Sequence, residues 1–267
     1  MATCYRHTSR ETGVSCANCD RPICPDCMTT TPVGMRCPEC SKQKTQVRHV
    51  RDSYNARPQV TVVLIALNVL VFFGMSSQSG LGSAGGSLLD SYALIPPEVG
   101  SPFNDYYRLV TSGFMHAGIL HIGFNMYILW FLGNLLEPSL GPWRFIGLYL
   151  AALLAGSLGV VLLDPNSLTV GASGAIFGLM GAAFVMQRAR GMDPMQSGIG
   201  PMILLNLALG FIIPNVSVAG HVGGLVGGAV AGFLVDRADG LRRGIAPALA
   251  ACLLVGGLAF GGAIALA

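Results

Sequence analysis

Long apolar segments, separated by short polar stretches, occupy most of the chain beyond Pro58. About 20 apolar residues cross the hydrocarbon core of a membrane as a helix, so segments of this length predict membrane-spanning helices. Seven spans are predicted, at residues 59–76, 118–136, 145–163, 168–187, 198–213, 216–235 and 245–266. The boundary between the fifth and the sixth rests only on a turn around Pro214-Asn215. The pattern predicts an all-α polytopic membrane protein.

The first 58 residues differ from this membrane body in charge. They hold nine of the sixteen Lys and Arg residues and five of the thirteen Asp and Glu residues. Over the whole chain only 11% of residues are charged and the mean hydropathy is +0.59, which argues against an ordinary soluble globular protein. The net charge of +3 is small and the basic residues form no stripe with interleaved aromatic residues, so no nucleic-acid partner is expected.

Seven of the eight cysteines lie between Cys4 and Cys40, and they are spaced in pairs. The pairs are Cys4 with His7, Cys16 with Cys19, Cys24 with Cys27, and Cys37 with Cys40. Each pair places two donor atoms on one tight turn, and two pairs complete a tetrahedral zinc site. A disulfide framework is disfavoured, because the cysteine number is odd and a histidine completes the set. The spacing predicts two structural zinc ions and, since thiolate sites suggest a reducing compartment, a cytosolic head.

This cysteine-rich segment resembles a B-box-type zinc finger, in which alternate pairs share a metal. The resemblance implies one zinc held by Cys4, His7, Cys24 and Cys27, and a second held by Cys16, Cys19, Cys37 and Cys40. No open coordination position is apparent, so a structural role is expected, with recruitment of a protein partner as a hypothesis. The predicted domains are a zinc-binding head at 1–41, a basic linker at 42–58, a six-helix core at 59–235, and a cytosolic loop with a seventh helix at 236–267.

The basic residues also predict the orientation of the membrane body. With the N-terminus inside, fifteen of the sixteen Lys and Arg residues face the cytosol and only Arg108 faces outside. The C-terminus is then outside. Arginine outnumbers lysine fourteen to two in a chain rich in Gly and Ala, which indicates a GC-rich bacterial genome and hence a bacterial plasma membrane.

Polar residues interrupt three of the predicted spans, and such residues mark functional sites by default because an unpaired polar group in hydrocarbon is costly. The candidates are His121 and Asn125 on one face of span two, Ser173 at the start of span four, and His221 at the start of span six. All three spans begin at the outer surface in the predicted orientation. These residues are therefore expected to lie at similar depth.

Together the candidates are the parts of an acyl-transfer site. His221 can act as a base for the Ser173 hydroxyl. His121, Asn125 and the backbone N–H of Ser173 can donate hydrogen bonds to an oxyanion. Each residue also has a simpler interpretation, since a serine in a Gly-rich helix often bonds its own backbone and a lone membrane histidine often serves packing or proton transfer.

Small residues predict close contact between spans four and six. The sixth span repeats glycine at every fourth position, and the fourth span has a small face; the residues are Gly220, Gly224, Gly228, Gly232, Gly174, Gly178 and Gly181. Small faces let helix backbones approach closely, although glycine ladders also occur in many transporters. Ser173 and Phe177 share a helix face, so the Phe177 ring is expected to pack against the His221 imidazole.

Three motifs in this order resemble the rhomboid intramembrane serine proteases: His121-x-x-x-Asn125, Gly171-x-Ser173-Gly174 and Gly220-His221-x-x-Gly224-x-x-x-Gly228. The resemblance covers about residues 59–235 and implies a rhomboid-like six-helix core, followed here by one C-terminal transmembrane helix. It implies a catalytic dyad of Ser173 and His221 with no third carboxylate. It further implies an oxyanion hole of His121, Asn125 and the Ser173 amide, with Gly171, Gly174 and Phe177 supporting the site.

The resemblance also implies a long outer loop that dips into the membrane. Residues 77–117 fit in length, and Tyr107-Arg108 stands where many members have Trp-Arg. His116 in this loop is a candidate to hold water near the site, with simple loop hydrogen bonding as the alternative. Phe177 stands where some members have Tyr, so it keeps the ring without the hydroxyl. Cys252 in the seventh helix is expected to be an ordinary small apolar residue.

The sequence thus predicts an intramembrane serine endopeptidase that cleaves transmembrane segments of other membrane proteins near their outer ends, with no cofactor for catalysis. Hydrolysis needs water, so the polar residues are expected to line a small outward-facing cavity. Small residues at the cleaved bond and helix-weakening residues nearby are expected in substrates. A non-catalytic rhomboid relative is one alternative, disfavoured because Ser173 and His221 are both present. A solute transporter is another, disfavoured because no inverted repeat is apparent.

Overall fold

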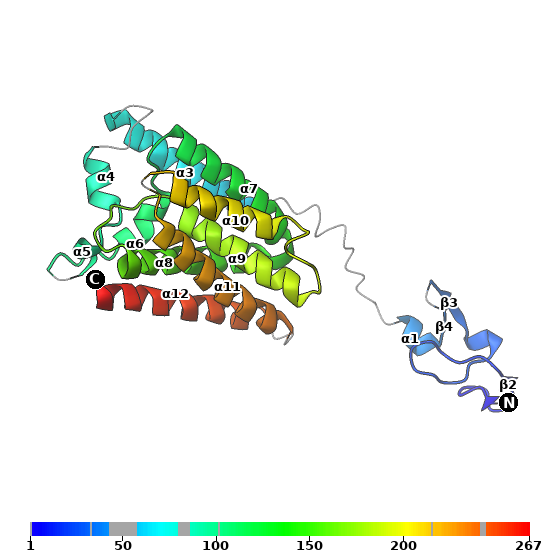
Figure 1. Ribbon diagram of the computed structural model, residues 1–267. Coiled ribbons are helices and arrows are strands. Elements are labelled where there is room, and N and C mark those ends of the chain that lie inside the picture. Colours follow the sequence, from blue (N-terminus) through cyan, green and yellow to red (C-terminus); the bar gives the residue numbers. More distant parts are fainter. Residues whose placement is uncertain are drawn as a thin grey trace. The chain divides into compact units, whose positions relative to one another are not determined.

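The computed structural model describes residues 2–32, 34–42, 58–79, 86–100, 102–214, 216–240 and 244–267. The chain divides into two units, Met1–Asp52 and Ser53–Ala267, each with its own internal contacts. Most of the predicted basic linker, residues 43–57, lies outside the described residues. Figure 1 labels most of the elements of both units.

The N-terminal unit, called the head below, consists of two short antiparallel hairpins and two single helical turns. β1 (Ala2–Thr3) pairs with β2 (Glu11–Thr12), and β3 (Thr29–Thr31) pairs with β4 (Gly34–Arg36). The turns are η1 (Pro25–Cys27) and α1 (Pro38–Lys42). Its buried cluster consists of six cysteines and Ile23, so the sequence supplies very little ordinary apolar core here.

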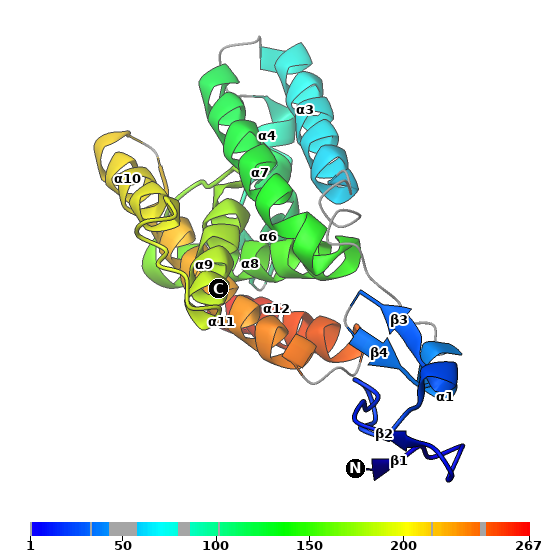
Figure 2. The same ribbon diagram turned by 90° about the vertical axis from the view of Figure 1, so that its right-hand side faces the viewer.

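The second unit, called the body below, is a helical bundle (Figures 1 and 2). Its seven long helices are α3 (Gln59–Ser79), α7 (Ile119–Leu140), α8 (Pro142–Leu163), α9 (Ser173–Ala189), α10 (Ile199–Ile212), α11 (Val218–Gly240) and α12 (Ala246–Leu266). Between α3 and α7 the chain forms the short elements α4 (Ser87–Tyr92), α5 (Pro96–Val99), α6 (Arg108–Thr111) and η2 (Ser112–Phe114). We call residues 86–118, described except for residue 101, the first loop.

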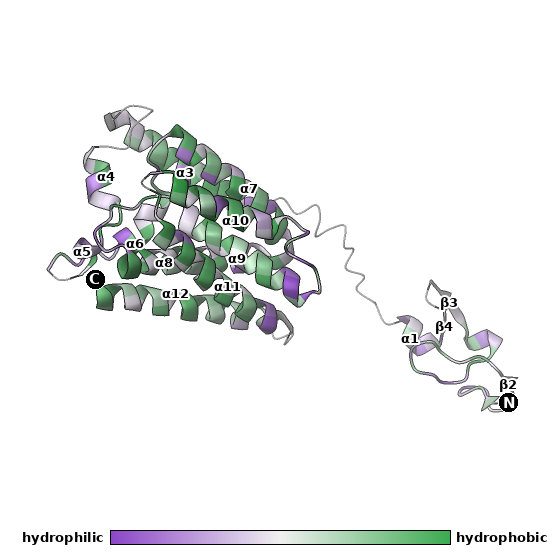
Figure 3. Ribbon diagram, in the orientation of Figure 1, coloured by the Kyte–Doolittle hydropathy of each residue, from purple (hydrophilic) through white to green (hydrophobic). Residues whose placement is uncertain are grey.

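The helices of the body are apolar along most of their length (Figure 3), as a membrane protein requires. Among the described residues, five helices are long and apolar enough to cross a membrane by themselves: α3, α7, α8, α11 and α12. Seven long helices occupy the seven predicted segments, but two of them are shorter than a full span. α9 has 17 residues and α10 has 14, so at 1.5 Å per residue they measure about 25 and 21 Å against about 30 Å of hydrocarbon.

Several predicted boundaries also shift for identifiable reasons. The fourth helix begins at Ser173 rather than at 168, because Thr169 instead pairs its backbone with Leu94. The third begins at Pro142 rather than at 145, directly after the turn at Gly141 that ends the second helix. The sixth continues to Gly240 rather than 235, with Arg237 in its last turn, where the helix dipole favours positive charge.

The tightest packing in the body joins α9 to α11 through small residues. A methyl group placed on Gly224 would lie 2.0 Å from the Gly174 carbonyl oxygen, and one on Gly228 would lie 2.2 Å from the Gly178 backbone. Gly232 repeats the pattern against Ala182. The predicted contact between these two spans is thus made backbone to backbone, at every fourth residue.

α8 joins this contact from a further side, which the sequence analysis did not anticipate. A methyl group on Gly156 would lie 3.1 Å from the Gly174 α-carbon, and one on Gly159 would lie 2.5 Å from the Ala219 carbonyl oxygen. Three helices therefore meet around the beginnings of α9 and α11. This convergence positions the candidate site described next.

Candidate active site and candidate metal centres

Ser173 is the first residue of α9, and the segment leading to it is held by backbone hydrogen bonds to the first loop. Thr169 and Leu94 exchange two such bonds, at 2.9 and 3.0 Å, and the Gly171 N–H donates to the Ser112 carbonyl at 2.9 Å. Gly171 has φ +128°, a conformation that disfavours any side chain. The chain therefore enters the serine helix through a fixed, extended approach rather than through an earlier helical turn.

His121 projects from the first turn of α7 toward this approach. The Ala117 N–H donates to His121 Nδ1 at 3.3 Å, which leaves the proton on Nε2. A methyl group on Gly171 would lie 2.8 Å from His121 Nε2 and 3.6 Å from Ser173 Oγ. The donor nitrogen and the hydroxyl thus flank the same glycine, and a side chain at residue 171 would fill the space between them.

Asn125 lies one turn further along α7 and is buried. Its Nδ2 donates to the His121 carbonyl at 2.9 Å, a bond within its own helix. A carboxamide has two N–H donors, so a second one is left for a ligand. This arrangement holds the side chain in one rotamer without using up its capacity to donate.

His221 lies in the first turn of α11 and is also buried. Its ring stacks on Phe177, with centroids 4.1 Å apart and planes 18° apart, which is the packing that the shared face of Ser173 and Phe177 predicts. On the α10 side, a methyl group on Gly210 would lie 3.3 Å from His221 Nδ1. The imidazole is therefore fixed by an aromatic face from α9 and by a close backbone approach from α10.

These groups line one cavity of about 1130 Å³. The candidate catalytic and oxyanion residues in its wall are Ser173, His221, His121 and Asn125, and the candidate supporting residues are Gly171, Gly174 and Phe177. They come from α7, α9, α11 and the approach to α9. Such a cavity admits water and part of an extended peptide, and its wall combines a hydroxyl, two imidazoles and an amide with apolar surface.

The first loop carries three of the residues named from the sequence, Tyr107, Arg108 and His116. The Arg108 guanidinium is buried; it pairs with Glu98 and Asp105 and donates to the carbonyl oxygens of Asp90 and Ala93 at 2.7 and 2.9 Å. It therefore ties the loop together, and nothing places it in the cavity wall. The neighbouring Tyr107 is exposed and donates from its hydroxyl to the Ser91 carbonyl at 3.1 Å.

His116 lies behind the cavity, with its ring edge-on to that of His121 at 5.0 Å between centroids. Burial, reinforced by the positive charge that His121 can carry, lowers the pKa of His116 to about 3. The ring is therefore neutral at physiological pH. It supports the His121 imidazole from behind by packing rather than by charge.

Sequence reasoning missed Glu137, a buried carboxylate near the end of α7. It accepts hydrogen bonds from the N–H groups of Val60 and Thr61 at 2.8 Å and from the Thr61 hydroxyl at 2.7 Å. It thus caps the first turn of α3, where a negative charge meets the positive end of the helix dipole. A lone carboxylate in an apolar segment was the available signal.

The head brings the eight candidate ligands together in two groups. Within each group all ligand atoms lie within 4.8 Å of one another. The groups are Cys4, His7, Cys24 and Cys27, and Cys16, Cys19, Cys37 and Cys40. This is the grouping that the B-box-type resemblance implies. All eight cysteines of the chain, Cys252 included, are free thiols.

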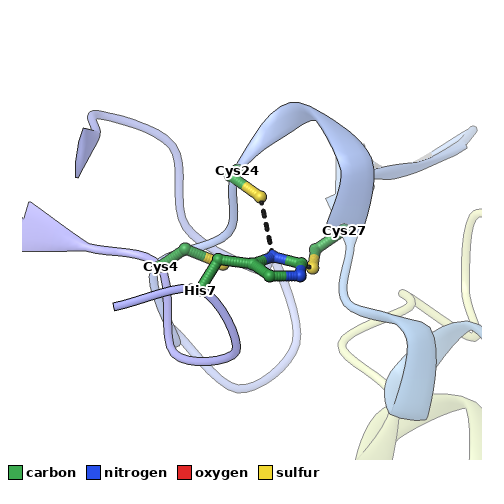
Figure 4. A group of neighbouring side chains, drawn as sticks. All are labelled: Cys4, His7, Cys24 and Cys27. Carbon is green, nitrogen blue, oxygen red and sulfur yellow. Dashed lines mark hydrogen bonds between the residues drawn. The ribbon is translucent and has the colours of Figure 1, made fainter. Parts of the chain in front are cut away.

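The geometry of both groups suits a tetrahedral metal. Metal–sulfur bonds of about 2.3 Å give tetrahedron edges of about 3.8 Å. His7 Nδ1 lies 3.3 Å from Cys24 Sγ and 3.5 Å from Cys27 Sγ (Figure 4), and Cys19 Sγ lies 3.8 Å from Cys37 Sγ. Soft thiolates with one imidazole are the donors that zinc prefers in closed structural sites.

Backbone hydrogen bonds favour the thiolate form at one ligand of the second group. The Cys37 N–H donates to Cys16 Sγ at 3.3 Å. This bond, opposed by burial, lowers the pKa of the Cys16 thiol to about 6. A lower thiol pKa favours the thiolate, which is the form that binds a metal.

Comparison with known proteins assigns the body to a family. The rhomboid domain model matches residues 104–238. The rhomboid protease GluP of Bacillus subtilis is 33% identical over 217 residues, covering 78% of this chain and 41% of that protein. The putative rhomboid protease YdcA of the same organism is 31% identical over 183 residues, covering 66% of this chain and 88% of that protein. RHOMBOID-like protein 6 of Arabidopsis thaliana is 35% identical over 138 residues.

The share of each relative's length that this chain covers differs between the relatives. This chain spans less than half the length of GluP and of RHOMBOID-like protein 6, but most of the length of YdcA. The matched domain contains the candidate site from α6 through α11. The head, the start of the first loop and α12 lie outside it.

Proposed function

This chain belongs to the rhomboid family, and on that premise we propose that it is an intramembrane serine endopeptidase, which hydrolyses peptide bonds in or near transmembrane segments of other membrane proteins. One observation carries the proposal: Ser173, His221 and two oxyanion donors line a single cavity. The names of GluP and YdcA as rhomboid proteases agree with this chemistry.

In the proposed reaction, His221 takes the proton from Ser173 Oγ while that oxygen attacks the carbonyl carbon of the substrate. Negative charge develops on the carbonyl oxygen, and His121 Nε2–H, the free N–H of Asn125 and the Ser173 amide donate hydrogen bonds to it. His221 then gives its proton to the leaving amine as the C–N bond breaks. Water, deprotonated by His221, hydrolyses the acyl-enzyme and releases the serine.

Phe177 and Gly171 support this proposal as positioning residues. The stacked Phe177 ring holds the imidazole plane without a carboxylate partner for the base. Gly171 leaves the space between His121 Nε2 and Ser173 Oγ open, which is where the carbonyl group must sit during attack. Preorganised donors of this kind contribute most when they need no movement during the reaction.

The depth of the site follows from the length of α9. The helix is about 25 Å long; Arg188 lies in its last turn and Arg190 follows its end, and the positive-inside rule puts both at the cytosolic surface. Ser173 would then lie several ångströms below the outer surface, so substrates would be cut near their outer ends. We propose a bacterial plasma membrane, a cytosolic N-terminus and an outer C-terminus on the same charge distribution.

The test is covalent labelling of the full-length, lipid-reconstituted protein with a fluorophosphonate. Wild type should label, and Ser173→Ala and His221→Ala should not. Ser139→Ala is the matched control: its hydroxyl bonds the Leu136 carbonyl on α7 away from the cavity, so labelling should persist. A folded wild type that stays unlabelled, and that cleaves no transmembrane substrate, would support a non-catalytic membrane-protein binder instead.

We further propose that the head binds two structural zinc ions through the two ligand groups. The donor chemistry and the spacing of the ligand atoms support it, and zinc would supply cross-links in place of an apolar core. Metal analysis of the purified chain should give two zinc ions per molecule. Cys24→Ser and Cys16→Ser should each give one, whereas Cys252→Ser should still give two. A stoichiometry near zero in wild type would contradict the proposal.

A further inference from the structure

The seventh long helix has no role in the reaction proposed above, and neither it nor the start of the first loop lies within the matched rhomboid domain. Its last three turns nevertheless pack against that loop. Leu94, Val99 and Leu109 of the loop form one buried cluster with Ala263 of α12. Phe260 and Ile264 of α12 pack on the same cluster. Leu94, Val99, Leu109 and Ala263 are each at most 1% exposed, so this contact is buried as fully as the core of the bundle.

The contact extends to the last residue of the chain as given. A methyl group on Gly100, next to Val99, would lie 2.6 Å from the carbonyl carbon of Ala267. α12 and the first loop therefore also meet backbone to backbone. α8 also takes part in this contact. Its residues Val160 and Val161 belong to the same cluster, and its Ser157 hydroxyl donates to the Leu109 carbonyl at 2.7 Å.

The same loop residues hold the approach to the serine helix. Leu94, in the cluster with Ala263, exchanges two backbone hydrogen bonds with Thr169, at 2.9 and 3.0 Å. The Ser112 carbonyl accepts from the Gly171 N–H at 2.9 Å. The segment from Thr169 to Gly171 is thus anchored at both ends to the first loop, and Ser173 begins its helix two residues later.

We propose that α12 is a positioning element for the active site, acting through the first loop. By packing on Leu94 and Val99, the end of α12 fixes the loop against α8. The loop in turn fixes the Thr169–Gly171 segment. This segment sets the position of Ser173 Oγ relative to His121, and with it the space beside Gly171 that would hold the substrate carbonyl. Residues Ala263, Phe260 and Val99 are positioning residues in this scheme and contact no reacting atom.

The alternative is that α12 merely anchors the chain in the membrane. An anchor packed on α8 would lose stability when its buried face changes, without a local effect on residues 169–172. A positioning element would be sensitive only on the face that meets the loop. α12 offers a matched pair for this distinction, because Ala263 is fully buried in the cluster whereas Ala265, two residues on, is exposed.

The experiment compares Ala263→Leu, Val99→Ala and the control Ala265→Leu in the full-length, lipid-reconstituted protein. The first readout is amide hydrogen exchange of residues 169–172. We expect exchange there to rise at least tenfold in Ala263→Leu and Val99→Ala, with α9–α11 interior amides and Tm close to wild type, and no change in Ala265→Leu. The second readout is the rate of fluorophosphonate labelling, or kcat for a cleaved substrate with KM nearly unchanged, which should fall at least tenfold in the same two variants.

The kinetic readout rests on the proposed proteolytic function, whereas the exchange readout does not. If wild type fails to label, the proposed function fails, and the exchange of residues 169–172 still tests the link from α12. Unchanged exchange in Ala263→Leu and Val99→Ala overturns the inference. A uniform rise of exchange across all helices overturns it as well, because it shows general destabilisation rather than a path through the loop.

Discussion

The head and the body hold their candidate sites in opposite ways. In the head, the candidate ligands are themselves the core, since Ile23 is the only member of its buried cluster that is not a cysteine. In the body, a large apolar core and a glycine contact between helices extend well beyond the cavity that contains Ser173 and His221, although Gly174 and Met180 belong to both. Loss of both metal sites should therefore unfold the head, whereas the body should stay folded when its site loses activity.

Removal of zinc has the largest expected effect. Binding of structural zinc supplies about 10–16 kcal/mol in small domains, far more than a unit of this size can gain from burying one isoleucine. A strong chelator should abolish hydrogen-exchange protection in residues 2–42 and leave protection in residues 58–267 unchanged. Added zinc should restore the head. Protection that survives metal loss would show that the head has another source of stability.

Asn125→Ala tests the separation of site and fold in the body. Loss of one oxyanion donor reduces kcat by about 10²–10³. Asn134→Ala is the matched control, since it lies on the same helix and makes the same type of bond, from its Nδ2 to the Trp130 carbonyl, but on an exposed face. We expect both variants to keep the wild-type Tm and only Asn125→Ala to lose turnover. A large fall of Tm in Asn125→Ala would show that the fold of the body depends on its candidate site, as that of the head does.

Gly228→Ala tests the glycine contact that builds the body. Its new methyl group would lie 2.2 Å from the Gly178 backbone, so α9 and α11 must separate, at a cost in the range of about 1–3 kcal/mol or more. Gly257→Ala on α12 meets nothing within 4 Å and should be neutral or slightly stabilising through better helix propensity. Thermal unfolding in detergent measures both. Equal Tm values for the two variants would contradict the prediction that the contact of α9 with α11 at Gly228 stabilises the body.

Acid should weaken both regions through different groups, with the smallest effect in the body. The pKa of His116 is lowered to about 3 in the folded chain, against about 6.5 when unfolded, so the unfolded state binds more protons as pH falls below 6.5. Stability falls by about 1.4 kcal/mol by pH 5.5. His116→Gln should reduce this fall in Tm. Excess zinc should restore the stability of the head in acid but not that of the body. Restored stability of both would refute the prediction that different groups titrate in the two regions.

The differences between the expected and observed helices have identifiable causes. The helix that carries Ser173 begins five residues later than hydropathy indicates, because Thr169 bonds Leu94, some 75 residues away in the chain. Hydropathy averages over a window and registers no such partner. Gly141 and Pro142, by contrast, mark the turn between α7 and α8 in the sequence itself.

The sequence by itself determined the classes of residue and their order. The pairwise spacing of cysteines predicts eight ligands for two metal sites, and the polar residues at the starts of three apolar segments predict the members of the candidate active site. These features are local, since a tight turn or one helical turn fixes them. Only the tertiary structure decided how α8 enters the contact of α9 with α11, how Glu137 caps α3, and how α12 reaches the approach to Ser173. Those contacts join residues far apart in the chain, and their energy depends on shape and on hydrogen bonds that appear only when the helices pack.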